Sequence, residues 1–340
     1  MSEPALSEIA VARHRPAEEI ASLLSGVALF DGLAPEELAG CEESVVRVEL
    51  APGEILWRQA THDRGLYVLL TGEAQVCRRL PGERELELAR LGPGDVIGEV
   101  VLLGASAHSA TVRAVGTCSL LFLSREQFDA RTLLGDRCAL ELRRRIVATV
   151  CERLRRTYGA VAETIDRAAP DCAGALAGMR HAQLLPAALP PLAYLSRLPL
   201  FRGLAPDLVA ELLGRARPLY VPRGEIVQHR GAQPRSCYVV VNGAVEEVVY
   251  RDGASLRVGF SGPGHLFGHL GLLDGKPAAV SSVTRERSLL LAIGGEKFET
   301  LIRGRGAPSR AFNAAIEADL IRSLEIAARA RSRLAAGRYS

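Results

Sequence analysis

The sequence GEVVLLGASAHSATV occupies residues 98–112 and shows how this part of the chain folds. Gly98 lets the backbone come close to a ligand, and the apolar residues after it suit a short helix. Exposed N–H groups at the start of such a helix attract anions. A loop then leads to a strand that begins at Ala110. We therefore expect a turn, a short helix and a loop, inserted between the strands of a barrel.

A similar stretch, GHLGLL, returns at residues 268–273, 170 positions further on. Other segments repeat at nearly the same offset. LFDGLAP at 29–35 returns as LFRGLAP at 200–206, and GPG at 92–94 returns at 262–264. The chain therefore contains two copies of one domain, and the differences between the copies point to function.

The repeat predicts the domain organisation. A brief N-terminal helix is expected near residues 16–24, because Pro16 suits a helix start. A connector between the copies is rich in Ala, Pro and Gly, and its prolines interrupt any long helix. The predicted parts are an N-terminal helical segment at 1–28, a first domain at 29–167, the connector at 168–193 and a second domain at 194–340.

Short apolar stretches separated by Gly, Pro and Asp turns predict the strands of a small barrel. In the first copy these stretches are 54–57, 65–71, 85–90, 110–114 and 119–124. A short helix is expected ahead of each barrel, at 35–41 and 206–213. The fold class predicted from this pattern is α+β, with two tandem β-roll (jelly-roll) barrels that are each followed by a long amphipathic helix.

The long helices are indicated by an apolar period of nearly four residues. The first stripe consists of Leu142, Ile146, Val150, Leu154, Tyr158, Val161 and Ile165, and the second of Phe312, Ile316, Leu320 and Leu324. Such a stripe suits packing against the helix's own barrel. It equally suits pairing with the helix of a second subunit in a homodimer. The sequence leaves both interpretations open.

Bulk properties exclude several classes of function. The formal net charge of +3 is too small to require a nucleic-acid or membrane partner. No apolar run approaches the ~18 residues of a membrane helix, and no signal peptide is recognisable. The seven cysteines are scattered without a C-x-x-C pair. Nucleophile elbow and P-loop motifs are missing. We expect a cytoplasmic protein that is not an enzyme.

The chain resembles two tandem cyclic-nucleotide-binding domains, and residues 98–112 carry this resemblance most closely. The layout is similar to the regulatory subunit of cAMP-dependent protein kinase and to the ligand domain of the catabolite activator family. The family's phosphate-binding cassette runs Gly-Glu-Leu-Ala-Leu-Leu, a short loop and Arg-x-Ala-Thr-Val. The resemblance covers about residues 29–161 and 200–331. It implies a site for cAMP or cGMP formed by Gly98, Glu99, Val100, His108, Ser109 and Ala110.

In this resemblance Glu99 accepts hydrogen bonds from a ribose hydroxyl. The first cassette departs from the family at His108, where the family has the arginine that pairs with the cyclic phosphate. A lost charge-assisted hydrogen bond weakens binding by ~1.5–3 kcal/mol, roughly ten- to a hundredfold. Histidine has an unperturbed pKa of about 6.5, and a bound phosphate favours its protonated form. The first pocket is therefore expected to be impaired but present.

The second cassette departs further. His269 stands at the position of the ribose-binding glutamate, and Ala278 at that of the arginine. The degenerate second site comprises Gly268, His269, Leu270, Ala278 and Ala279. We expect no ordinary cyclic-nucleotide binding there. His265 and His269 stand four residues apart, but a metal site is not expected, because Gly268 indicates that the helix begins only there.

Two hypotheses of function follow. In the first, the protein senses a cyclic nucleotide through its first domain and signals to an unidentified protein partner. In the second, both domains are pseudo-receptors that form a ligand-independent dimerisation or docking platform. Regulators of the catabolite activator type carry a helix-turn-helix after the long helix, whereas four residues follow the second stripe's helix here, so DNA binding is not expected. No cofactor is expected beyond a nucleotide ligand.

Overall fold

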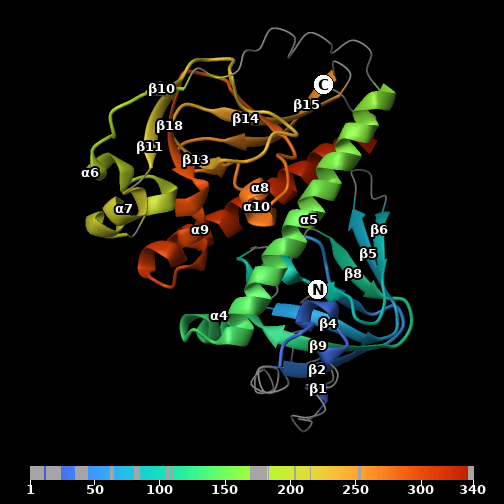
Figure 1. Cartoon of the computed structure of the whole chain (residues 1–340). Helices are drawn as coiled ribbons and strands as arrows, with labels where there is room; N and C mark the ends of the chain where they lie inside the picture. Colours follow the sequence, from blue (N-terminus) through green and yellow to red (C-terminus); the bar gives the residue numbers. More distant parts are fainter. Residues whose placement is uncertain are drawn as a thin grey trace. The chain divides into compact units, whose positions relative to one another are not determined.

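The computed structural model describes most of the chain (Figure 1). The described residues are 11–12, 24–34, 45–61, 65–79, 85–104, 108, 110–168, 182, 184–202, 204–214, 216–251 and 254–335. They divide into two compact units, Met1–Val147 and Ala148–Ser340. The helix expected at 35–41 and nearly all of that expected at 16–24 lie outside the described residues.

The first unit contains two facing sheets. One has the strand order β1-β2-β9-β4-β7 and the other β3-β8-β5-β6. Its elements are β1 (Val11–Ala12), η1 (Ala28–Phe30), β2 (Val45–Leu50), β3 (Ile55–Trp57), β4 (Gly65–Thr71), β5 (Ala74–Arg79), β6 (Glu85–Leu91), β7 (Val96–Ile97), α3 (Glu99–Leu102), β8 (Thr111–Ala114), β9 (Cys118–Ser124), α4 (Arg125–Leu133) and α5 (Arg137–Ala168).

The core of the first unit lies between these sheets and is rich in aromatic residues. The ring centroids of Trp57 and Tyr67 are 5.4 Å apart, and those of Tyr67 and Phe122 are 4.8 Å apart. These side chains belong to a buried cluster with aliphatic residues of both sheets. Burial of this apolar surface is the main source of the unit's stability.

The second unit repeats the arrangement, with sheets β10-β11-β18-β13-β16 and β12-β17-β14-β15. Its elements are β10 (Leu185–Pro186), α6 (Leu192–Leu195), η3 (Pro199–Phe201), α7 (Pro206–Leu213), β11 (Arg217–Val221), β12 (Ile226–Gln228), β13 (Ser236–Asn242), β14 (Val245–Arg251), β15 (Ala254–Ser261), β16 (Leu266–Phe267), α8 (Leu270–Asp274), β17 (Ser281–Thr284), β18 (Ser288–Gly294), α9 (Gly295–Arg303) and α10 (Ala307–Ala335).

These elements confirm the predicted fold class, with a β-roll and a long helix in each copy. The strands expected at 65–71 and the helix expected at 206–213 match β4 and α7 at both ends. Strands β2 and β5 were not predicted from the sequence. Part of the expected connector is extended, because β10 pairs with β11 through Leu185 opposite Tyr220.

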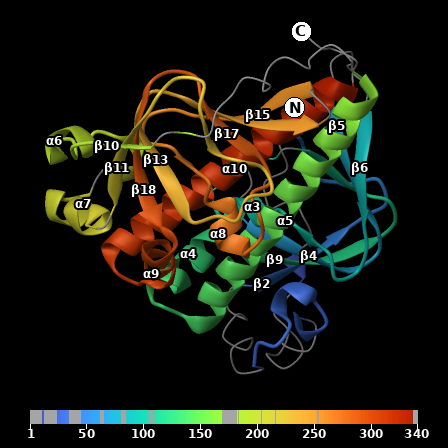
Figure 2. The same ribbon diagram turned by 45° about the horizontal axis from the view of Figure 1, so that its top comes forward.

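The two long helices bury the predicted stripes. Every described stripe residue of α5 is buried, whereas Leu324 at the end of the α10 stripe is half-buried. Helix α10 packs against α9, β15 and α7 within the second unit (Figure 2). In that unit the stripe thus covers its own barrel, as one of the two interpretations expected.

Helix α5 is continuous but belongs to both units, because the boundary falls after Val147. Arg145 donates a hydrogen bond to the carbonyl of Leu29 in the first unit, at 3.0 Å. Residues 148–168 group with the second barrel. The domain expected at 29–167 therefore shares the last part of its helix with the second unit.

Candidate functional site

The first cassette begins at Gly98, whose positive φ of 85° favours glycine. A Cβ atom here would lie 3.0 Å from the carbonyl oxygen of Gly65 and 3.0 Å from the Trp57 ring. Both neighbours are parts of the packed barrel and cannot easily move. Gly98 therefore allows the chain to turn from β7 into α3 directly against the strands.

The cassette buries the two polar residues that the sequence singled out. Glu99 is the first residue of α3 and is 6% exposed, and His108 in the following loop is 5% exposed. Ala110 is also buried, and Val100 is half-buried. Ser109 lies outside the described residues. A carboxylate and an imidazole are thus both held inside the first barrel.

His108 is held in place by β3 and by the turn that follows this strand. Its imidazole stacks on the indole of Trp57, with centroids 3.9 Å apart and planes at 8°. Its backbone N–H donates to the carbonyl of Thr61, and its carbonyl accepts from Ala60 N–H, both at 2.9 Å. The imidazole is therefore held flat against the face of the indole.

Trp57 in turn is held by the cassette. Its Nε1–H donates to the carbonyl of Ala110 at 3.1 Å. The indole therefore bridges the loop residue His108 and Ala110, which directly precedes β8. The sequence analysis missed this role, although Trp57 is the single tryptophan of the chain and lies in a predicted strand.

The second cassette repeats the backbone but not the chemistry. Gly268 again has a positive φ, of 77°, and precedes His269 and α8. His269 is 4% exposed, and burial lowers its pKa to about 4. No hydrogen-bond partner of its Nδ1 is found among the described residues. The imidazole is therefore neutral at pH 7 and supplies no charge for a phosphate.

Protein side chains fill most of the second pocket. The remaining cavity has a volume of about 20 Å³, enough for about one water molecule. It is lined by Leu154 and Tyr158 of α5, Glu247 of β14, Ser323 of α10 and the cassette residues Gly268, His269, Leu270, Ala278 and Ala279. A cyclic nucleotide does not fit into this space.

Glu247 makes the second pocket still less suited to an anion. Burial raises the pKa of its carboxyl to about 7. Glu247 lies opposite Ser282 on the neighbouring strand, and the corresponding pair in the first unit is Val76 opposite Val112. The second barrel has therefore replaced an apolar pair by a carboxylate and a hydroxyl. The repeat comparison of positions 76 and 247 contains this signal, which the sequence analysis did not use.

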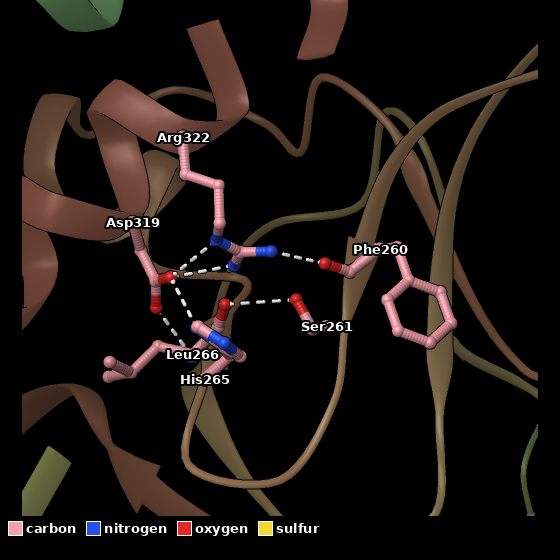
Figure 3. Close-up of polar contacts among 6 residues, drawn as sticks. All are labelled: Phe260, Ser261, His265, Leu266, Asp319 and Arg322. Atoms are coloured by element: carbon pink, nitrogen blue, oxygen red, sulfur yellow. Dashed lines mark hydrogen bonds and ion pairs between the residues drawn. The ribbon is translucent and has the colours of Figure 1, made fainter. Parts of the chain in front are cut away.

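A polar cluster fixes α10 to the loop ahead of the second cassette (Figure 3). Asp319 accepts hydrogen bonds from the N–H of Leu266 at 2.6 Å and from Nη2 of Arg322 at 2.6 Å. His265 Nδ1 lies 3.1 Å from the same carboxylate. Arg322 also donates to the carbonyl of Phe260.

Burial alone would raise the pKa of Asp319. The hydrogen bond with His265 and the positive charge of Arg322 outweigh burial and hold this pKa below its usual range. His265 is thus engaged with a carboxylate of α10. Among the described residues, no cluster of His, Cys, Asp or Glu side chains is placed to hold a metal ion.

The geometry of two like cassettes agrees with the comparison to known families. The sequence model of the cyclic nucleotide-binding domain family matches residues 47–131 and 218–305, which together exceed half of the chain. The chain therefore belongs to the cyclic nucleotide-binding domain family, with two tandem copies, as the sequence analysis predicted.

Curated relatives include bacterial regulators. The cyclic AMP receptor protein of Thermus thermophilus is 36% identical over 107 residues, which are 32% of this chain and 50% of the relative. A CRP-like cAMP-activated global transcriptional regulator of Mycobacterium tuberculosis is 23% identical over 143 residues, which are 42% of this chain and 62% of that protein. The chain thus spans less than two thirds of either relative.

Several solved structures are similar to this chain at low TM-scores. The regulatory domain of Toxoplasma gondii PKA, co-crystallised with cAMP, is 18% identical with a TM-score of 0.32, covering 85% of this chain and 93% of that chain. The N-terminal domain of a transcriptional regulator from Streptomyces coelicolor is 31% identical with a TM-score of 0.35, covering 41% and 93%. The family membership rests on the sequence match.

The described helices include none that is both long and apolar enough to cross a bilayer. The matched family model is a cyclic nucleotide-binding domain, and three of the similar proteins named above have a regulator or a regulatory domain in their descriptions.

Proposed function

We propose that the first unit binds a cyclic nucleotide and that the second unit does not. The observation that carries this proposal is the burial of Glu99 and His108 in one cassette, next to a glycine that lets the chain turn directly against the strands. Val100, Ser109 and Ala110 complete the proposed ligand-binding set. The relatives named for cAMP support this class of ligand.

Each polar residue has a distinct role in this proposal. The Glu99 carboxylate accepts hydrogen bonds from a ribose hydroxyl. His108 donates to the cyclic phosphate, whose negative charge favours the protonated imidazole, and Trp57 fixes the orientation of the ring. Because imidazole presents one donor where the family's guanidinium presents a fork, we expect weaker binding than in a complete cassette.

The regulatory output is proposed to pass to a protein partner through α5. Helix α5 follows the first barrel and continues into the second unit. A ligand can move such a helix only if it binds one helix position more tightly than another. We propose a non-enzymatic, cytoplasmic signalling role without DNA binding.

The direct test is calorimetric titration of the full chain with cAMP and with cGMP at pH 6. We expect about one nucleotide bound per chain. Fluorescence of the single tryptophan gives an independent signal, because Trp57 stacks on His108 in the proposed pocket. A folded protein that shows neither heat nor a fluorescence change would overturn the proposal.

A second candidate function is the pseudo-receptor platform, in which neither unit binds nucleotide. The filled pocket of the second unit favours this function for that half of the chain. If the titration shows no binding, the platform function would apply to the whole protein, and the search would turn to protein partners.

A further inference from the structure

The second cassette is contacted by a side chain from outside its own barrel. Arg155 of α5 donates Nη2–H to Oδ1 of Asp274 at 2.8 Å, and its Nε–H also contacts this carboxylate. The same guanidinium donates to the carbonyls of Pro277 at 2.7 Å and Lys276 at 3.2 Å. All of these residues belong to the second unit.

These contacts join α5 to the loop between α8 and β17. Asp274 is the last residue of α8, and its Oδ1 also accepts from the N–H of Lys276 at 3.1 Å. Both charged side chains are largely buried, with exposures of 17% for Arg155 and 13% for Asp274. A planar guanidinium that satisfies a carboxylate and two carbonyls holds this loop in one conformation.

Two neighbours of Arg155 on α5 enter the pocket itself. Leu154 and Tyr158 are four residues apart and hence on one face of the helix, and both line the remaining cavity. Tyr158 is hydrogen-bonded to Ser323 of α10, and burial raises the pKa of its hydroxyl. The Tyr158 side chain thus lies inside the pocket, and its hydroxyl contacts α10.

We propose that the second cassette is a docking site for a helix, and that its occupant is residues 154–158 of this chain's own α5. Leu154 and Tyr158 take up space in the pocket, and Arg155 holds the loop between α8 and β17. The order of this loop thereby depends on α5 being in place. This inference does not depend on nucleotide binding by the first unit.

The chemistry of the pocket suits this occupant better than a nucleotide. Ala278, Ala279 and Val280 of the cassette form an apolar wall of the pocket, and His269 beside them is neutral. The acceptors are concentrated at the rim, where Asp274 and the two carbonyls face the guanidinium. An apolar wall with an acidic rim matches a helix that carries Leu, Arg and Tyr on one side.

Hydrogen exchange of the full chain, followed by mass spectrometry, tests the proposal. Arg155→Ala should speed exchange at least tenfold in residues 268–280 and in residues 148–165, while β18 keeps its protection. Arg156→Ala is the matched control, because Arg156 is the next residue on the helix and is exposed. It should exchange like the natural protein.

The partner variant distinguishes a specific contact from general destabilisation. Asp274→Ala should give the same local increase as Arg155→Ala, and the double variant should give little more than either alone, because one interaction is removed in all three. Unchanged exchange in residues 268–280 would overturn the proposal. So would an equal increase throughout the second unit, including β18, or full additivity of the two substitutions.

Discussion

The two cassettes share a backbone and differ in what occupies it. In the first, Glu99 and His108 are buried polar groups beside Trp57. In the second, His269 is neutral and Leu154 and Tyr158 of α5 fill the pocket. The comparison teaches that a positive-φ glycine and a short helix make a cradle, whereas the side chains around it determine whether a ligand or a helix lies there.

The largest expected effect concerns Glu99. Glu99→Ala removes the proposed acceptor of the ribose hydroxyl, and hydrogen bonds to a charged group contribute ~1.5–3 kcal/mol each. We expect nucleotide affinity to fall by about a hundredfold, the upper end of this range, in calorimetric titration of the full chain. His269→Ala, the corresponding change in the second cassette, should leave affinity unchanged. Equal affinities of the natural protein and Glu99→Ala would place the ligand elsewhere.

The second largest expected effect is a pH dependence of stability that is specific to the second unit. The pKa of Glu247 is raised from 4.5 to about 7, so the folded second unit favours the protonated carboxyl. The stability that this preference provides is full below pH ~4.5 and is lost as pH rises through 7, at about 1.4 kcal/mol per pKa unit and hence about 3 kcal/mol in all. Glu247→Gln should abolish this loss.

The measurement is hydrogen exchange of second-unit peptides between pH 5 and 8, corrected for the intrinsic pH dependence of exchange. Neighbouring groups are the Arg322 and Asp319 side chains of α10, the Tyr158 hydroxyl of α5 and the His269 imidazole. His269 acts in the opposite sense, because its lowered pKa costs stability as pH falls from about 6.5 towards 4. Glu286→Gln, at an exposed position, should behave like the natural protein; the same slope in Glu247→Gln would contradict the prediction.

A gain of function is expected at His108. His108→Arg restores the forked donor for the phosphate, and an arginine can stack on Trp57 as well. Affinity for cAMP should rise roughly ten- to a hundredfold. Ala278→Arg is the matched change in the second cassette and should create no second site, because α5 fills that pocket. Two nucleotides bound per chain of the Ala278→Arg variant would show that the filled pocket can open.

The smallest expected effect is the pH dependence of binding. If His108 contacts the phosphate in its protonated form, affinity should be roughly three- to tenfold higher at pH 6 than at pH 8. His108→Arg should remove this dependence, since a guanidinium stays charged throughout. A natural protein with equal affinity at both pH values would exclude the imidazolium as the phosphate partner.

Much of the fold was predictable because the same local sequence patterns occur in both copies of the repeat. The turns, the short cassette helix and both apolar stripes follow from local patterns, whereas Glu99 and His108 could be named from the resemblance to the family's cassette. The contents of the second pocket were not predictable from those patterns. Tyr158 was recognised as part of a stripe, but a stripe does not reveal which barrel the residue will enter.

The roles of Trp57 and Glu247 in the two pockets were not predicted from the sequence. Trp57 lies in a strand whose burial was expected, but its stack on His108 depends on a loop 51 residues later in the sequence. Glu247 replaces the inward-facing Val76 of the first copy, which a position-by-position comparison would have flagged. Contacts between distant segments decide both cases, and local composition does not encode them.

The shared helix also determines where the chain can be cut. A fragment that starts at residue 194, where the second repeat begins, would lack Leu154, Arg155 and Tyr158 and would expose the apolar wall of the pocket to water. Exposed apolar surface of this kind promotes aggregation. A fragment that starts at Ala148 would keep this cover, because the compact second unit begins before the second sequence repeat does.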